Sequence, residues 1–171
     1  MVNKMKVSVI LAHPNTASFN HAIAKTTVDV LKQNGHVVFY HDLYQENFDP
    51  LLPTGEIPMN VPLPIEIEKH CKEISEADGI VVIHPNWWGL PPAILTGWVD
   101  RIMRPGVAYE FLETDSGEGV PNGLLKAKKA IVFNTSNTET EREKKVFRDP
   151  LETILIYLIF LYPKCRDARE P

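Results

Sequence analysis

The chain has 171 residues, close to the usual size of one domain and long enough to bury an independent core. Hydrophobic residues make up 44% and charged residues 23%, which excludes a disordered, collagen-like or coiled-coil chain. Eighteen Lys and Arg against 22 Asp and Glu give a net charge of −4, so no basic excess favours nucleic acid as a partner. Two cysteines, Cys71 and Cys165, are too few for a disulfide scaffold or a cysteine-rich metal site.

Two apolar runs, residues 7–12 and 154–162, are short. A signal peptide has a longer apolar core and a small-residue cleavage site, whereas His13 and Pro14 follow the first run. A membrane-spanning helix needs about 20 apolar residues, which neither run provides. We therefore predict no membrane insertion and, given the few cysteines, a cytoplasmic location.

Apolar runs with β-branched residues predict strands, and apolar residues at helical spacing predict the helices between them. Gly35 stands where a left-handed cap would end the first helix. In chain order we predict a strand at 6–12, a helix at 21–34, a strand at 36–40, a loop at 43–64, a helix at 65–77, a strand at 79–84, a helix at 91–103, a loop at 105–123, a strand at 130–134 and a mostly helical segment at 139–162 with a break near Asp149 and Pro150.

Strands that alternate with helices predict an α/β domain built as a three-layer, doubly wound parallel sheet. We expect one domain over residues 1–171, with 163–171 as a loose tail. Four strands are recognised, which leaves the fifth strand of such a sheet uncertain or missing. Because ligands of these sheets bind beyond the carboxyl ends of the strands, three loops become candidates, those after residues 12, 84 and 134.

The first loop, residues 13–20, offers hydroxyl and amide side chains and free backbone N–H groups at a helix start. Such a helix start is a site for an anion, to which His13 adds a donor or a positive charge. The chain lacks the glycine pattern of a dinucleotide-binding turn and the glycine-lysine pattern of a nucleotidase phosphate loop. The alternative is an ordinary helix cap by Ser18 or Asn20.

The second loop contains two adjacent tryptophans, Trp87 and Trp88, followed by Gly89. Large aromatic side chains at a strand end form a flat slot for a planar ring, and a glycine lets the backbone approach it. The alternative is that a tryptophan packs into the core or against a neighbouring subunit. The third loop, residues 134–139, is dense in hydroxyls and amides that suit the heteroatom edge of a ring, or simply cap the helix that follows.

Together the three loops supply an anion site, an aromatic slot and a polar rim. A flat heterocycle with a phosphate on a polar tail fits this combination, and flavin mononucleotide (FMN) is such a molecule.

The same segments resemble the flavodoxin-like NAD(P)H:quinone oxidoreductases of the DT-diaphorase type. That family includes small bacterial quinone reductases and potassium-efflux ancillary proteins. The resemblance covers roughly residues 5–155 and rests on the segments 11–20, 77–93, 98–101, 106–111 and 134–137.

The resemblance implies a bound flavin, FMN or FAD, and NAD(P)H as co-substrate. The implied flavin contacts are His13, Ser18, Phe19 and Asn20 at the phosphate end, Pro85, Asn86, Trp87 and Trp88 along the isoalloxazine ring, and Thr135, Ser136 and Asn137 at its polar edge. Trp88, Tyr109 and Phe111 are implied near the substrate. No catalytic side chain is assigned, since the tyrosine and histidine of the mammalian members have no match, and the other histidines show no metal-binding spacing.

The implied function is ping-pong transfer of two electrons from NAD(P)H through the flavin to a quinone or similar planar acceptor. One alternative is a flavin-binding regulatory subunit that docks on a membrane ion-efflux transporter, and another is a flavin-free structural protein. Relatives share the active site between two subunits, which predicts a homodimer with Trp88 or Trp98 near its interface. The segment from Asp149 is expected to be helical to about residue 160 and to pack on the sheet.

Overall fold

The computed structural model describes residues 3–112 and 120–156, and its centre is a parallel four-stranded sheet. The strand order is β2-β1-β3-β6, so the chain reverses its direction of winding between β1 and β3. The three-layer α/β architecture is therefore confirmed. The strands are β1 (Lys6–Leu11), β2 (Val37–Asp42), β3 (Gly79–Pro85) and β6 (Lys129–Thr135).

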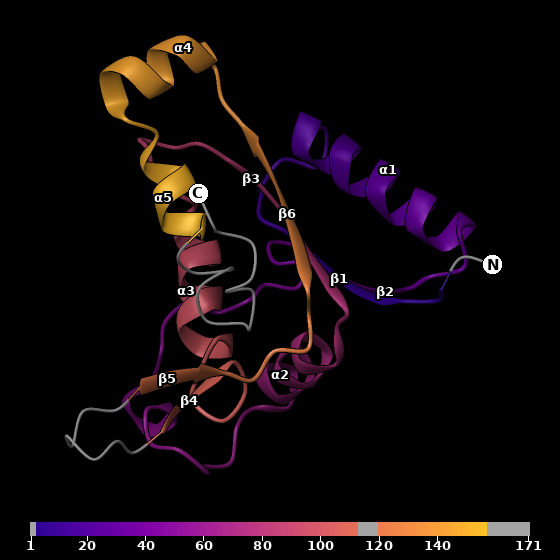
Figure 1. Cartoon of the computed structure of the whole chain (residues 1–171), viewed down its shortest axis with the longest axis vertical. Helices are drawn as coiled ribbons and strands as arrows, with labels where there is room; N and C mark the ends of the chain where they lie inside the picture. Colours follow the sequence, from indigo (N-terminus) through magenta and orange to yellow (C-terminus); the bar gives the residue numbers. More distant parts are fainter. Residues whose placement is uncertain (1–2, 113–119, 157–171) are drawn as a thin grey trace.

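Helices cover both faces of this sheet (Figure 1). One face carries α1, and the other carries α2, α3 and α5. No helix in the described part of the chain is long and apolar enough to cross a membrane. The helices are α1 (Phe19–Gln33), the 3-10 turn η1 (Thr54–Glu56), α2 (Ile65–Glu76), α3 (Ala93–Ile102), α4 (Thr140–Arg142), the π-helical turn η2 (Glu143–Phe147) and α5 (Pro150–Ile156).

Alternation along the strands divides the core into two apolar clusters, one on each face. On the α1 side, Val9 and Leu11 of β1 pack with Ala24 and Val28. On the other side, Ile10 joins apolar residues of α2 and α3. Burial on both faces is why the central strands read as continuous apolar runs.

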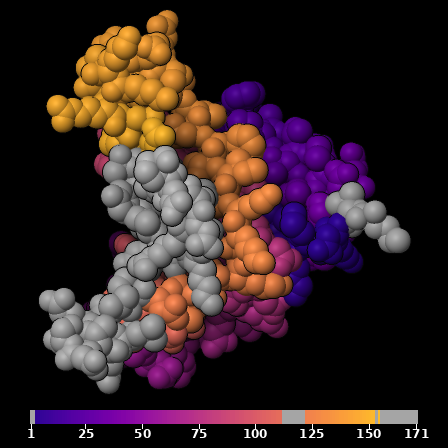
Figure 2. Space-filling model, in the orientation of Figure 1, coloured from indigo at the N-terminus to yellow at the C-terminus, as the bar shows by residue number. Residues whose placement is uncertain are grey.

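The outer strand β6 departs from this pattern, because Ile131 is 54% and Phe133 is 38% exposed. Both lie on the face away from α3, and Figure 2 shows β6 atoms (orange) at the surface beside α1 (purple). No fifth strand pairs with β6 among the described residues. The predicted tail at 163–171, and the predicted helix beyond residue 156, lie outside the described residues.

Local signals at the ends of α1 act as expected. Ser18 is the N-cap residue, and its hydroxyl oxygen accepts a hydrogen bond from the His21 backbone N–H. At the other end Gly35 adopts φ +82°, and its N–H donates to the Lys32 carbonyl at 2.9 Å. This left-handed residue closes the helix and sends the chain back into β2.

Two predicted loops contain structure that the sequence pattern missed. The segment 105–123 forms an antiparallel hairpin of β4 (Tyr109–Leu112) and β5 (Val120–Gly123), which was expected to be a loop. The segment 43–64 includes η1. The helix start predicted at 21 falls two residues earlier, since Ser18 is the cap. The predicted break near Asp149 is confirmed, because Arg148 and Asp149 both have positive φ.

A buried ion pair ties the long 43–64 segment to α3. Arg101 donates from Nε and Nη2 to the two carboxylate oxygens of Glu56, at 3.0 and 2.5 Å, and from Nη1 to the Asp49 carbonyl at 2.7 Å. Arg104 adds a bond to the Glu56 carbonyl at 2.6 Å. Both partners of the ion pair are buried, so removing one would leave an uncompensated charge.

The close approach of this segment requires a glycine at position 97. A Cβ added at Gly97 would overlap the carbonyl oxygen and side chain of Pro50. We expect Gly97→Ala to lower the free energy of unfolding by roughly 1–3 kcal/mol. Helix propensity alone favours alanine over glycine by about 1 kcal/mol. A lower free energy of unfolding in Gly97→Ala would therefore come from the overlap with Pro50.

Urea unfolding measures this change, and Gly55→Ala is the matched control. An added Cβ at Gly55 has nothing within 4 Å, so its stability should stay within about 0.5 kcal/mol of the parent. A Gly97→Ala protein as stable as the parent would contradict the account.

Candidate functional site

The three candidate loops meet at the carboxyl edge of the sheet, and Thr135 joins them. Its hydroxyl accepts a hydrogen bond from Asn20 Nδ2 at 2.9 Å, and its carbonyl accepts one from the Asn86 backbone N–H at 2.7 Å. His13 and Trp87 add a ring contact between the first and second loops, with centroids 6.0 Å apart. One residue from each loop is therefore fixed relative to the others.

The first loop presents hydrogen-bond donors at the start of α1. The backbone N–H groups of Phe19 and Asn20 have no acceptor within the helix, because they belong to its first turn. His13 Nδ1 accepts from the Asn15 backbone N–H at 3.1 Å, so the neutral ring carries its hydrogen at Nε2. These donors and the helix dipole suit a phosphate group, and the loop contains no lysine or arginine.

Asn20 also leaves an acceptor unused. The residue is 3% exposed, and its Oδ1 has no hydrogen-bond partner in the described part of the chain. A buried carbonyl oxygen without a donor costs about 1–3 kcal/mol. A ligand group that donates a hydrogen bond here would recover that cost.

The second loop is a tight turn with Trp88 at its tip. The backbone groups of Trp87 and Leu90 bond each other in both directions at 3.1 Å, and Asn86 Oδ1 accepts from the Gly89 N–H at 2.8 Å. Trp88 has φ +61° and is 99% exposed, whereas Trp87 is 41% exposed. A left-handed backbone costs a residue other than glycine roughly 1–2 kcal/mol. This turn therefore holds a large aromatic ring in water at an energetic cost, as functional sites do.

The rest of the loop residues form the margin of this edge. Phe19 is 73% exposed, Pro85 is buried at the end of β3, and the hydroxyl of Ser136 accepts from the Thr138 backbone N–H. Asn137 is exposed beside them. All eleven residues predicted to contact a flavin thus lie in the three loops or at the strand ends that carry them, at the carboxyl edge.

Tyr109 and Phe111 lie elsewhere in the chain. They are stacked edge to face at 5.4 Å on the hairpin, which leads into the amino end of β6 (Figure 1). The structure therefore does not bring them to the candidate site within one chain, because α3 carries the backbone back across the sheet. Trp98, the second tryptophan named in the dimer prediction, is 4% exposed and packs in the chain's own core.

Sequence reasoning assigned no role to His84 or to His21. His84 ends β3 fully buried, and burial lowers the pKa of its imidazole, so the ring is uncharged at neutral pH. Its Nδ1 donates to the Pro85 carbonyl at 2.9 Å, while Nε2 has no partner among the described residues. His21 sits between Ser18 and Asp42, with both ring nitrogens in contact. For His84 the available signal was its place at the end of an apolar strand, whereas His21 reads as an ordinary helical residue in the sequence.

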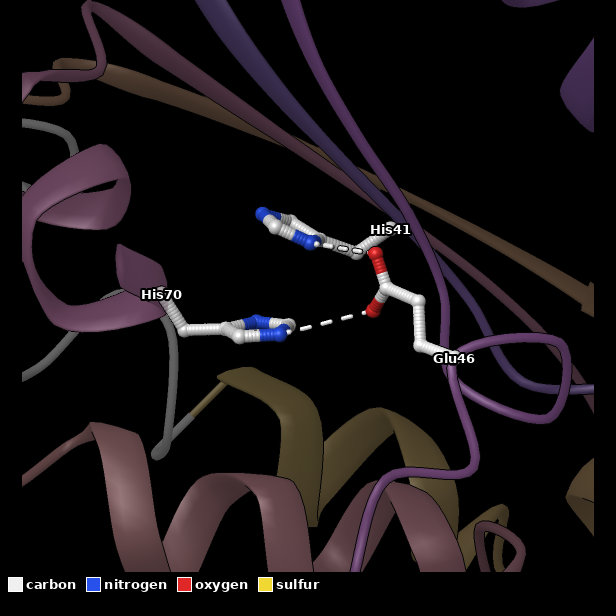
Figure 3. A group of neighbouring side chains, drawn as sticks. All are labelled: His41, Glu46 and His70. Atoms are coloured by element: carbon white, nitrogen blue, oxygen red, sulfur yellow. Dashed lines mark hydrogen bonds and ion pairs between the residues drawn. The ribbon is translucent and has the colours of Figure 1, made fainter. Parts of the chain in front are cut away.

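A second polar cluster consists of His41, Glu46 and His70 (Figure 3). It lies on the α2 side of the sheet, opposite the face that carries α1 and His21. Glu46 bridges the two rings, with Oε1 3.0 Å from His41 Nδ1 and Oε2 3.4 Å from His70 Nε2. His41 Nε2 is also 2.7 Å from the Glu73 carboxylate, without the alignment of a hydrogen bond. Two imidazoles and a carboxylate are ligands that divalent metals accept, so the geometry of the three groups decides whether they can bind a metal ion.

The geometry does not fit a metal ion. The buried Trp98 Nε1–H donates to His70 Nδ1 at 3.0 Å, so the neutral His70 ring carries its hydrogen at Nε2, toward Glu46. A metal at Nε2 would put that hydrogen at Nδ1, facing the Trp98 donor. The two rings are also stacked at 3.8 Å and 28°, so their nitrogen lone pairs do not converge. We interpret the cluster as a hydrogen-bonded link between the segment after β2 and α2.

Comparison with known proteins agrees with the fold and the motifs. The family described as a flavodoxin-like fold matches residues 5–167. An uncharacterized NAD(P)H oxidoreductase of Haemophilus influenzae is 38% identical over an alignment of 158 residues that covers 90% of this chain and 76% of that protein. NAD(P)H dehydrogenase [quinone] 1 of Cavia porcellus is 29% identical over 86% of this chain and 59% of its own length.

Among solved structures, the NAD(P)H:quinone oxidoreductase from Methanothermobacter marburgensis is 26% identical with a TM-score of 0.76, covering 92% of this chain and 78% of that one. This chain belongs to the flavodoxin-like fold family, as its strand-end motifs predicted.

The histidine cluster generates a prediction on acid stability. Partial burial opposes ionisation of Glu46, but hydrogen bonds from His41 and His70 outweigh it and lower the pKa of Glu46 from 4.5 to about 2. A lowered folded-state pKa stabilises the protein above about pH 4.5, and that contribution is lost as the pH falls toward 2. We expect Glu46→Gln to lose stability at neutral pH and to flatten this acid-side slope.

Thermal unfolding recorded between neutral and acid pH measures the effect. Glu66→Gln, at an exposed position on the same α2 helix as His70, is the control and should follow the parent curve. An unchanged acid-side slope in Glu46→Gln would contradict the assigned link.

Proposed function

We propose that the chain is a flavin-dependent NAD(P)H:quinone oxidoreductase. The observation that carries this proposal is the joining of three loops at Thr135, which places an anion-binding helix start beside exposed tryptophans and a polar rim. The names of the relatives described above support the same reaction class. No specific observation favours docking on a membrane transporter.

The residues present fit a flavin. The N–H groups of Phe19 and Asn20, with His13 Nε2–H, would hold the phosphate, and the unpartnered Asn20 Oδ1 would accept from the hydroxylated tail. Trp87 and Trp88 would flank the ring system. Thr135, Ser136 and Asn137 would meet its polar edge. These contacts apply to FMN and to the matching half of FAD alike.

When bound, the flavin supplies acceptance of hydride from NAD(P)H and its delivery to a quinone. The chain's own residues bind and orient. Trp88 at 99% exposure leaves aromatic surface for a planar molecule, so NAD(P)H and the acceptor would use one place in turn. Ping-pong kinetics follow from that sharing.

The proposed enzyme is a homodimer. Trp88 and Phe111 are exposed aromatic residues at opposite edges of the sheet in one chain, at 99% and 60%. In a twofold arrangement the hairpin of one copy, with Tyr109 and Phe111, would reach the strand-end site of the other. Tyr109 and Phe111 of one copy would then contact the substrate in the site of the other copy.

The double variant Ser18→Ala, Asn20→Ala tests the assignment of the first loop. We expect flavin affinity to fall by at least about tenfold, since the variant removes the Ser18 hydroxyl beside the phosphate, the Asn20 Oδ1 acceptor and the Asn20 bond to Thr135 that joins the loops, each worth roughly 0.5–1.5 kcal/mol. Quinone-dependent oxidation of NAD(P)H should fall with flavin occupancy. Flavin fluorescence titration and steady-state assays measure both quantities.

Lys25→Ala, on an exposed turn of the same helix, is the control and should bind flavin normally. Unchanged flavin affinity in the double variant would contradict the loop assignment. Flavin-bound protein that never oxidises NAD(P)H would contradict the proposed reaction.

Sedimentation tests the dimer. At roughly micromolar concentration the chain should sediment near twice its 19.4 kDa mass. Trp88→Ala should weaken association by about 1 kcal/mol, because part of its ring would contact the partner's hairpin at the margin of the substrate site. Leu51→Ala, at a 74% exposed site away from the loops, should leave association unchanged. A monomeric parent protein would contradict the shared site.

A further inference from the structure

Three side chains form a continuous polar chain behind the anion-binding loop. Ser18 Oγ lies 3.1 Å from His21 Nδ1, and His21 Nε2 lies 2.9 Å from Asp42 Oδ2. Ser18 caps α1, whereas Asp42 ends β2, so these side-chain contacts link a helix to a strand. The His21 and Asp42 side chains are only 14% and 9% exposed, which holds the ring in this orientation.

When His21 is neutral, these contacts occupy the Ser18 hydrogen. The Asp42 carboxylate accepts only, so His21 carries its single hydrogen at Nε2 and leaves a lone pair at Nδ1. The Ser18 hydroxyl must then donate to Nδ1. It has no hydrogen for a ligand, and the uncompensated Asp42 charge lies behind the anion site.

When His21 is protonated, both conditions change. Nδ1 carries a hydrogen and donates to Ser18 Oγ, which also accepts from the His21 backbone N–H at 3.3 Å. The Ser18 hydrogen becomes available to a phosphate oxygen. The imidazolium also balances the Asp42 charge, so an incoming anion no longer meets a net negative pair.

The other groups near His21 do not take over this role. Lys25 pairs with Asp29 at 2.6 Å in solvent, and the His13 ring centroid is 6.3 Å away. Tyr40 stays neutral, because burial and then the charges of Asp42 and Glu46 raise its pKa to about 12. His21, Lys25, Asp29 and Tyr40 all line one open hollow, which gives the His21 ring a path for proton exchange with water.

We propose that the phosphate of the flavin binds together with a proton on His21, so that His21 and Asp42 are positioning residues for the Ser18 hydroxyl. This inference rests on the proposed flavin site. The phosphate-binding loop contains no lysine or arginine, so protonated His21 would supply its positive charge. The affinity for FMN would then depend on pH.

Binding of FMN and of riboflavin to the flavin-free full chain tests the proposal. Riboflavin has the same ring and lacks the phosphate. Calorimetry in buffers of different ionisation enthalpy, at about pH 7.5, measures the protons taken up on binding. We expect net proton uptake for FMN and none for riboflavin, with FMN affinity falling as the pH rises, by at most about tenfold per pH unit for one linked proton.

Two variants separate positioning from structure. His21→Gln cannot take up a proton, so it should lose the proton uptake and bind FMN about tenfold more weakly, with riboflavin affinity unchanged. Asp42→Asn removes the negative charge and, through its amide donor, lets neutral His21 carry its hydrogen at Nδ1. FMN should therefore bind this variant more tightly than the parent above about pH 8. A purely structural Asp42 would give weaker binding.

His36→Gln, at the amino end of β2, is the matched histidine control and should keep the proton uptake. Because the FMN phosphate titrates near pH 6 in every variant, the comparison is made between variants at one pH. FMN binding with the same proton uptake in His21→Gln would overturn this inference alone. Failure of the parent to bind either flavin would overturn the proposed function and this inference with it.

Discussion

Two hydrogen bonds to Thr135, one to its hydroxyl and one to its carbonyl, hold the candidate site together. They exist because β6 pairs with β3 in a register that sets Thr135 opposite Pro85, at the end of both strands. A shift of one residue would turn the Thr135 hydroxyl to the other face and release Asn20. The anion-binding helix start, the tryptophan turn and the polar rim therefore depend on strand pairing as much as on their own residues.

Local signals explain why much of the fold could be predicted from the sequence. The apolar runs of β1 and β3 are buried on both faces, and Ser18 and Gly35 mark the ends of α1 through backbone chemistry that involves only neighbouring residues. The hairpin at 105–123 was missed, because its strands are four residues each and stabilise one another across a glycine-containing segment. The buried Arg101–Glu56 pair depends on a contact 45 residues away in sequence, which no local pattern carries.

The candidate site shows the same division. The residues proposed to face a flavin follow strand ends, so topology and resemblance could locate them. The residues proposed to position the Ser18 hydroxyl could not be found this way, since His21 reads as an ordinary helical residue until Asp42 is placed beside it at the end of β2. Trp98 illustrates the converse, because a tryptophan on an apolar helix face suits an interface or a core, and only its bond to His70 identifies the core. Alternation along β2 turns Asp42 toward α1 and His41 toward α2, so two adjacent residues serve separate clusters.

The proposed flavin site is one edge of the sheet, formed by three loops. Amide NMR during titration with FMN tests this claim most directly. We predict shifts in all three segments, residues 13–20, 85–88 and 135–137, that saturate together with one affinity, while the amides of α2 stay unchanged. Shifts confined to one of the three loops, or centred on α2 and its histidine cluster, would contradict the account.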